Sequence, residues 1–181
     1  MATSSPNRVS AFHRLGLSGL VFALGFQAIV TQSLLVREAL VLMFGSELAW
    51  GAVFFAWLLG VALGGALGGW LESKLEKAEM GLAAIIATLS IAVCVELWLF
   101  RSARAWLGLQ TGELLPLPTT LWVAVVLVTP IGALVGTAFP LACRLAEHGL
   151  ATKSAGPLGR IYAVESLGSL FGGAVFSFWA I

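Results

Sequence analysis

Residues 57–69 read WLLGVALGGALGG, a run without a charged side chain in which five positions are glycine. The glycines form two rows at four-residue spacing: Gly60, Gly64 and Gly68, and Gly65 and Gly69. In lipid, small residues at this spacing let two helix backbones approach closely. The run therefore predicts a membrane-spanning helix that packs against another helix through a glycine face.

The rest of the chain has the same apolar character. Of its 181 residues, 59% are hydrophobic and only 10% are charged, whereas a soluble domain carries about a quarter charged residues. The apolar runs are continuous, with lengths suited to helices that cross a bilayer, and they do not alternate with period two as barrel strands do. The expected fold class is an all-α polytopic membrane protein with about five transmembrane helices.

Polar breaks divide the chain into a cytoplasmic amino-terminal segment at 1–14 and a single transmembrane domain at 15–181. The expected spans are about 15–36, 48–71, 79–100, 119–142 and 159–181. The first run is too long for a secretory signal. The longest connection, 101–118, has room for no more than a short surface helix, so no second domain is expected.

The four-residue glycine spacing recurs in the fourth and fifth spans, at Gly132 and Gly136 and at Gly168 and Gly172. With Gly60, Gly64 and Gly68, these are the predicted helix-packing positions. Two readings stay open: the glycine faces only pack, or they slide past one another in alternating access. In the fourth span, Pro130 and Pro140 each remove a backbone donor and should weaken or kink the helix.

The first span carries a polar stripe. Gln27, Thr31 and Glu38 lie within about 40° of one another when successive residues are 100° apart. Strongly polar side chains are costly inside a membrane, so the stripe should face the bundle interior. It is either a substrate or proton path, or a set of interhelical hydrogen bonds with Glu38 reaching the outer interface.

The fifth span carries Glu165 about two turns from its cytoplasmic end, with Tyr162 on nearly the same face. A buried carboxylate there could exchange protons, or it could pair with a cytoplasmic base such as Arg144 or Arg160. Glu96 lies near the outer end of the third span, and we expect Glu165 to be the better candidate of the two.

Motifs of soluble enzymes are missing from the sequence. It contains no nucleophile elbow, phosphate loop or dinucleotide fingerprint. Neither His13 nor His148 has a partner spaced for a metal or haem site, and no cluster of Lys and Arg suits nucleic acid. We therefore expect no catalytic residue, metal, cofactor or nucleic-acid partner for this chain.

Several stretches together resemble one family: 32–38 (QSLLVRE), 44–48 (FGSEL), 57–64 (WLLGVALG), 130–144 (PIGALVGTAFPLACR) and 159–173 (GRIYAVESLGSLFGG). In combination they resemble the membrane half of bacterial spermidine synthase-like membrane proteins, over nearly the whole chain after residue 15. That half is similar in plan to the major facilitator superfamily. Residues 68–74 (GGWLESK) look like a degenerate form of the loop between helices two and three of those transporters, with the acidic position kept and its basic neighbour displaced.

The resemblance implies a transporter-like module for a small cationic metabolite, with Gln27, Thr31, Glu38 and Glu165 facing a cavity. The aminopropyltransferase-like domain of many family members is missing here, so no catalysis by this chain alone is expected. Two alternatives are a structural accessory subunit of a larger membrane complex and a membrane anchor for a separate synthase domain. Five spans are one short of a transporter half, so the expected partners are the bilayer and other membrane chains, unless the polypeptide continues.

Basic residues predict the orientation, because positively charged loops stay in the cytoplasm. Seven lie on the side of the amino terminus: Arg8, Arg14, Lys74, Lys77, Arg144, Lys153 and Arg160. Three lie opposite: Arg37, Arg101 and Arg104. The outer ends of the spans then carry five tryptophans: Trp50, Trp98, Trp106, Trp122 and Trp179. We expect a multi-pass protein of a bacterial-type inner membrane with a cytoplasmic amino terminus.

Labelling of single-cysteine variants in intact cells tests this orientation. An impermeant thiol reagent should label a cysteine placed in the loop 101–118 and leave Lys74→Cys and Lys153→Cys unlabelled, because both lysines are expected inside. Labelling of Lys153→Cys from outside would invert the topology.

Overall fold

The computed structural model describes residues 6–72, 74, 78–110, 113–148 and 156–179. Within these residues the chain forms five α-helices and no strand: α1 Pro6–Leu42, α2 Glu47–Glu72, α3 Ala78–Trp106, α4 Leu117–His148 and α5 Gly156–Trp179. All five are long and apolar enough to cross a membrane. The predicted class, an all-α polytopic membrane protein, is confirmed. Lys77 and Lys153, which entered the charge count, lie outside the described residues.

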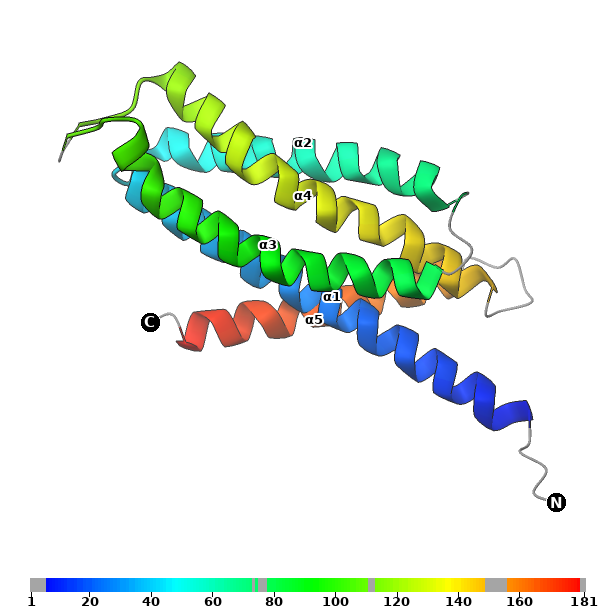
Figure 1. The fold of residues 1–181 in the computed structure, drawn as a ribbon. Helices are drawn as coiled ribbons and strands as arrows, with labels where there is room; N and C mark the ends of the chain where they lie inside the picture. The colour runs from blue at the N-terminus through cyan, green and yellow to red at the C-terminus, as the bar shows by residue number, and fades with distance from the viewer. Residues whose placement is uncertain (1–5, 73, 75–77, 111–112, 149–155, 180–181) are drawn as a thin grey trace.

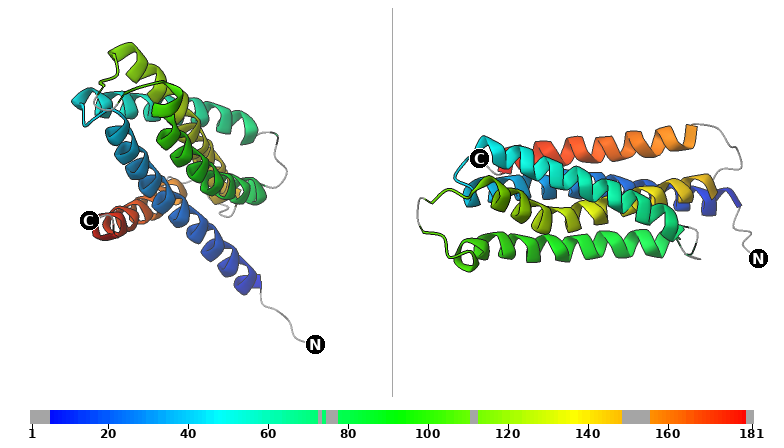
Figure 2. Two further views of the ribbon diagram at one scale, coloured as in Figure 1. Left: turned by 60° about the vertical axis from the view of Figure 1, so that its left-hand side comes forward. Right: turned by 90° about the horizontal axis from the view of Figure 1, so that it is seen from above.

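The helices lie lengthwise beside one another, and the chain reverses direction between them (Figure 1). Helices α1, α3 and α5 therefore run one way, and α2 and α4 run the other way. The two ends of the chain lie at opposite ends of the bundle (Figures 1 and 2). This arrangement agrees with an odd number of membrane crossings.

The most extensive helix contact joins α2 and α4. It is formed around five glycines: Gly60, Gly64 and Gly68 of α2, and Gly132 and Gly136 of α4. A methyl group added to Gly64 would overlap the carbonyl oxygen of Ala133 and lie 2.7 Å from its Cα. Across the contact, Thr129 Oγ1 donates a hydrogen bond to the carbonyl of Ala56 (3.2 Å). The two backbones therefore touch directly, which gives the close packing that holds helices together in lipid.

A second glycine contact joins α1 and α5. Gly168 and Gly172 of α5 lie against the backbone of α1, and Gly25 of α1 lies against the carbonyl of Glu165. A methyl group at any of these three glycines would overlap the other helix. Ser169 Oγ donates a hydrogen bond to the carbonyl of Gly25 (3.1 Å). Small residues thus fix α5 on α1 as they fix α2 on α4.

The second glycine row of α2 has no such contact. Nothing lies within 4 Å of a methyl group built on Gly65 or Gly69. Helix α2 therefore packs through one of its two glycine rows. Helix α4 is continuous from Leu117 to His148 with Pro130 and Pro140 inside it.

Three helices extend farther than the predicted spans. Helix α1 begins at Pro6 and ends at Leu42, α3 ends at Trp106, and α4 ends at His148. The helices therefore continue past the predicted span ends at 36, 100 and 142, whereas the candidate membrane-spanning part of α1 begins at Leu15, as predicted. The assignment of 1–14 to the cytoplasm stays a prediction. Hydropathy marks where charged residues begin, but a helix continues there because its backbone hydrogen bonds do not depend on side-chain charge. Pro6 suits a helix start, since the first turn needs no donor at that position.

Buried apolar side chains form two clusters. The first joins α1, α2, α3 and α4 and includes Leu35, Trp57, Phe100 and Ile131. The second joins α1, α3, α4 and α5 and includes Val21, Leu82, Leu141 and Ile161. Helix α5 contributes to the second cluster only, so much of its surface faces outward.

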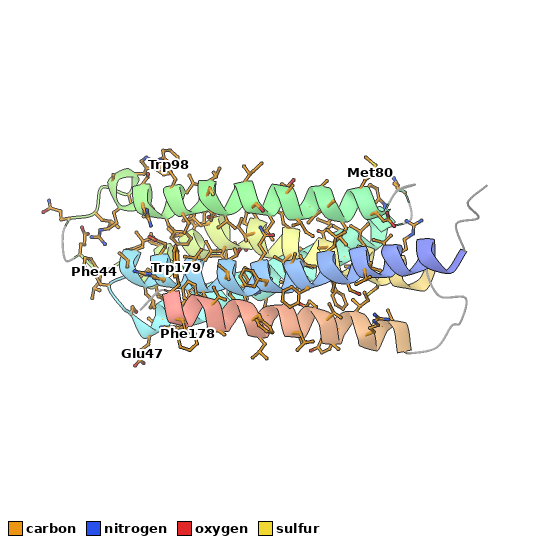
Figure 3. The ribbon with its side chains drawn as sticks, turned by 90° about the horizontal axis from the view of Figure 1, so that it is seen from below. Phe44, Glu47, Met80, Trp98, Phe178 and Trp179 are labelled. Atoms are coloured by element: carbon orange, nitrogen blue, oxygen red, sulfur yellow. The ribbon has the colours of Figure 1, made fainter. Side chains whose placement is uncertain are left out.

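The tryptophans expected near one interface are all exposed: Trp50, Trp98, Trp106, Trp122 and Trp179. Figure 3 shows Trp98 and Trp179 at the same end of the bundle as Phe44, and Met80 at the other end. The exposed indole rings of Trp98 and Trp179 suit a membrane–water interface at that end, where an apolar ring with a polar N–H is favoured.

Gly64→Leu should lower the stability of the folded protein by about 1–3 kcal/mol or more, because the new side chain must push α4 away. Gly65→Leu is the matched control, since the space beside Gly65 is open. Thermal unfolding in a mild detergent, followed by circular dichroism, measures both changes. Equal losses in the two variants would contradict this packing face.

Candidate functional site

A polar contact joins the middle of α1 to α3. Gln27 Nε2 donates a hydrogen bond to Ser90 Oγ (2.8 Å). Ser90 Oγ in turn donates to the carbonyl of Ile86 in its own helix (3.0 Å). The serine hydroxyl is therefore used both as acceptor and as donor, and the amide of Gln27 makes an interhelical bond.

An ion pair joins the same two helices nearer their ends. Arg101 donates to Glu38 Oε1 from Nη2 (2.9 Å) and from Nε (3.3 Å). The Glu38 side chain is only 14% exposed, whereas Arg101 is 69% exposed. The guanidinium thus reaches toward the surface while it neutralises a largely covered carboxylate.

These two contacts fix the register of α1 against α3. The partners are 63 residues apart in both pairs, so the helices run parallel with a constant offset. Nearly one turn beyond Arg101, Arg104 Nη1 donates to the carbonyl of Leu42 (2.9 Å), and its guanidinium lies 4.4 Å from the centre of the Phe44 ring. Helix α3 therefore supplies a donor to the last carbonyl of α1, which has no partner within its own helix.

Two buried polar side chains lie between these contacts along the helices. Thr31 of α1 is 2% exposed and Glu96 of α3 is 6% exposed. We define the polar column as these residues with the two pairs: Gln27, Thr31 and Glu38 of α1, and Ser90, Glu96 and Arg101 of α3. Two members of the predicted stripe, Gln27 and Glu38, thus contact α3, and Thr31 is buried on the same face of α1.

Glu96 has the least favourable surroundings in the column. It lies on the face of α3 that carries Leu89, Val93 and Phe100, which belong to or pack on the first apolar cluster. Its Oε1 atom is the only buried side-chain nitrogen or oxygen in the described part of the chain that has no hydrogen-bond partner. An unpaired carboxylate oxygen among apolar groups is costly, and no described residue donates a hydrogen bond to it.

The candidates on α5 do not join the polar column. Helix α5 packs mainly on α1 through the glycine contact. Glu165 is half-buried there, and its side chain makes no hydrogen bond or ion pair with a described residue. Tyr162 is 63% exposed. The structure therefore separates these two residues from Gln27, Thr31 and Glu38.

Sequence reasoning gave too little weight to Glu96 and Arg101. Glu96 follows Leu89 by two helical turns and precedes Phe100 by one, so the helical period could have placed it on the buried face. The apolar run ends at Phe100, which predicts a loop position for Arg101. No sequence signal pairs it with Glu38, since that contact depends on how α1 and α3 pack.

The column contains two carboxylates, Glu38 paired with Arg101 and Glu96 without a partner for one oxygen, and it does not resemble a metal centre. Among the described residues, no three His, Cys, Asp or Glu side chains gather where they could hold a metal ion.

No family model matches the chain, and no characterised protein or solved structure is significantly similar to it. Within the column, only Glu96 keeps a buried side-chain oxygen that can still accept a hydrogen bond, among the residues that the structure describes.

Exchange of the two charges tests the ion pair. Glu38→Arg should lower the melting temperature, because it removes the counter-charge of Arg101 and places a second guanidinium at a largely covered position. Adding Arg101→Glu should restore most of the loss, since the pair re-forms with its charges reversed. Thermal unfolding in detergent compares the wild type with both variants. A double variant no more stable than Glu38→Arg alone would contradict the contact.

Proposed function

We propose that this chain is a transporter-like membrane module that moves a small cation, with Glu96 as the counter-charge inside the membrane. The proposal rests on the buried Oε1 atom of Glu96, which has no hydrogen-bond partner among the described residues. Ionisable side chains within membrane helices are rare and commonly mark ion or substrate paths. A proton or an organic cation bound at Glu96 would neutralise the carboxylate and supply the donor that the fold does not.

The rest of the polar column supports this assignment. Ser90 lies about 9 Å before Glu96 along α3, and Arg101 lies about 8 Å beyond it, at 1.5 Å per residue. The charge of Arg101 is already matched by Glu38, so it repels an approaching cation less than a free guanidinium would. Because Glu38 is paired with Arg101, Glu96 is the carboxylate of the column that keeps no ion-pair partner among the described residues.

The motifs quoted above support an organic amine as this cation, through their resemblance to spermidine synthase-like membrane proteins. The same resemblance supports a major-facilitator-like arrangement completed by other membrane chains or by a continuing polypeptide. The distribution of basic residues supports a bacterial-type inner membrane with a cytoplasmic amino terminus.

A second candidate function is that of a structural accessory subunit. The observation that favours it is the outward surface of α5, where large apolar side chains are at least half exposed: Leu167, Leu170, Phe171 and Val175. Another membrane chain could cover this surface through the same close packing that joins α1 to α5. In that case the polar column would serve only to hold α3 on α1.

Glu96→Gln should reduce uptake of labelled spermidine into liposomes by about ten-fold or more, which corresponds to the loss of at least one strong charge interaction. The amide keeps the shape of the side chain but carries no negative charge. The protein is purified from its native membranes with any chains that accompany it, and uptake is measured with an imposed pH gradient.

Glu47→Gln is the control, because Glu47 is exposed in the first turn of α2. Its uptake should equal that of the wild type. Uptake by Glu96→Gln at the wild-type rate would defeat the proposed role of Glu96. A wild-type preparation that contains stoichiometric partner chains and shows no uptake would favour the accessory subunit.

A further inference from the structure

A groove of about 780 Å³ lies on the other side of α1 from the polar column, between α1, α2 and α5. Helix α1 forms its floor from Ile29 to Val41. Trp50 and Phe54 of α2 form one wall, with their rings stacked at a centroid distance of 6.0 Å, and Phe176 of α5 contributes to the other. Most of the lining is apolar, so the groove suits a hydrocarbon chain.

One of the residues that line this groove, Arg37, carries a positive charge. Arg37 is exposed, lines the groove, and makes no hydrogen bond or ion pair with any described residue. Its neighbour Glu38 is bound to Arg101 instead, about 100° around the helix. No acidic side chain is among the residues that line the groove. A ligand that fills the groove and balances the charge of Arg37 must therefore be negatively charged itself.

The dimensions of the groove match one leaflet of a bilayer. Its floor runs from the middle of the apolar segment Leu15–Leu42 to the end of that segment. Twelve residues separate Ile29 from Val41, a rise of about 18 Å, whereas half of a hydrocarbon core is about 15 Å thick. Arg37 lies about 8 Å before the end of α1, and its long side chain can reach the headgroup level. Trp50 is exposed there, as an interfacial indole would be.

We propose that this groove binds a single anionic phospholipid, with the phosphate held by Arg37 and one acyl chain lying between Phe54 and Phe176. A guanidinium and a phosphate fit one another through paired N–H donors, which makes arginine suited to this headgroup. An apolar helix of another chain could fill the groove but would leave Arg37 without a counter-charge. The lipid satisfies both the apolar walls and the cation.

Native mass spectrometry of the purified protein tests this site. The protein in detergent is given equal amounts of phosphatidylglycerol and phosphatidylcholine, and the lipid retained by each variant is identified. The wild type should prefer phosphatidylglycerol, and Arg37→Gln should lower this preference about five-fold, the effect of one arginine at an anionic membrane surface. Arg37→Lys should keep most of the preference because it keeps the charge.

Two further variants define the site. Arg160→Gln removes an exposed arginine of α5 that does not line the groove, and it should leave the preference unchanged. Ser33→Trp fills the groove floor and should reduce retention of both lipids. An unchanged preference in Arg37→Gln, or an equal loss in Arg160→Gln, would overturn the proposal. So would a photo-crosslinker at position 33 that links to a polypeptide rather than to lipid in native membranes.

Discussion

Direct contact between the backbones of α2 and α4 is the constraint on which the rest of the bundle depends. Lipid is as apolar as the helix surfaces, so burial from water does not drive the helices together. Glycines such as Gly64 and Gly136 remove the side chains that would hold the two helices apart. Helix α3 packs on α4, and α1 packs on α3, so this contact sets where the polar column lies.

Helix α1 has a different chemistry on each of its sides. Toward α3 it presents Gln27 and Glu38, toward α5 it presents Gly25, and toward the groove it presents Arg37. Adjacent positions on a helix are about 100° apart, so two neighbouring charges reach separate surfaces. One helix thus carries a carboxylate within the bundle and a guanidinium open to the outside, and the proposed cation path and lipid site do not compete.

Much of the candidate site could be predicted from local sequence. The stripe of Gln27, Thr31 and Glu38 follows from the helical period alone. Gln27 and Glu38 contact α3, and Thr31 is buried. The helical period also places Glu96 on the apolar face of α3, but how deeply Glu96 and Glu165 are buried could not be predicted, because burial depends on which helices cover a residue. Helix α5 is covered mainly by α1, whereas α3 is covered by both α1 and α4 on its Glu96 side.

The sequence by itself determined an all-helical membrane fold with five apolar helices, because a backbone in lipid must bond to itself and each run is long enough to do so. It also determined where helices could approach closely, through the spacing of its glycines. Only the tertiary structure decided that Gly64 and not Gly65 is used, that Glu38 binds Arg101, and that Glu96 is left without a partner for one oxygen. These outcomes depend on contacts between helices distant in the sequence, whose rotation and register no single helix specifies.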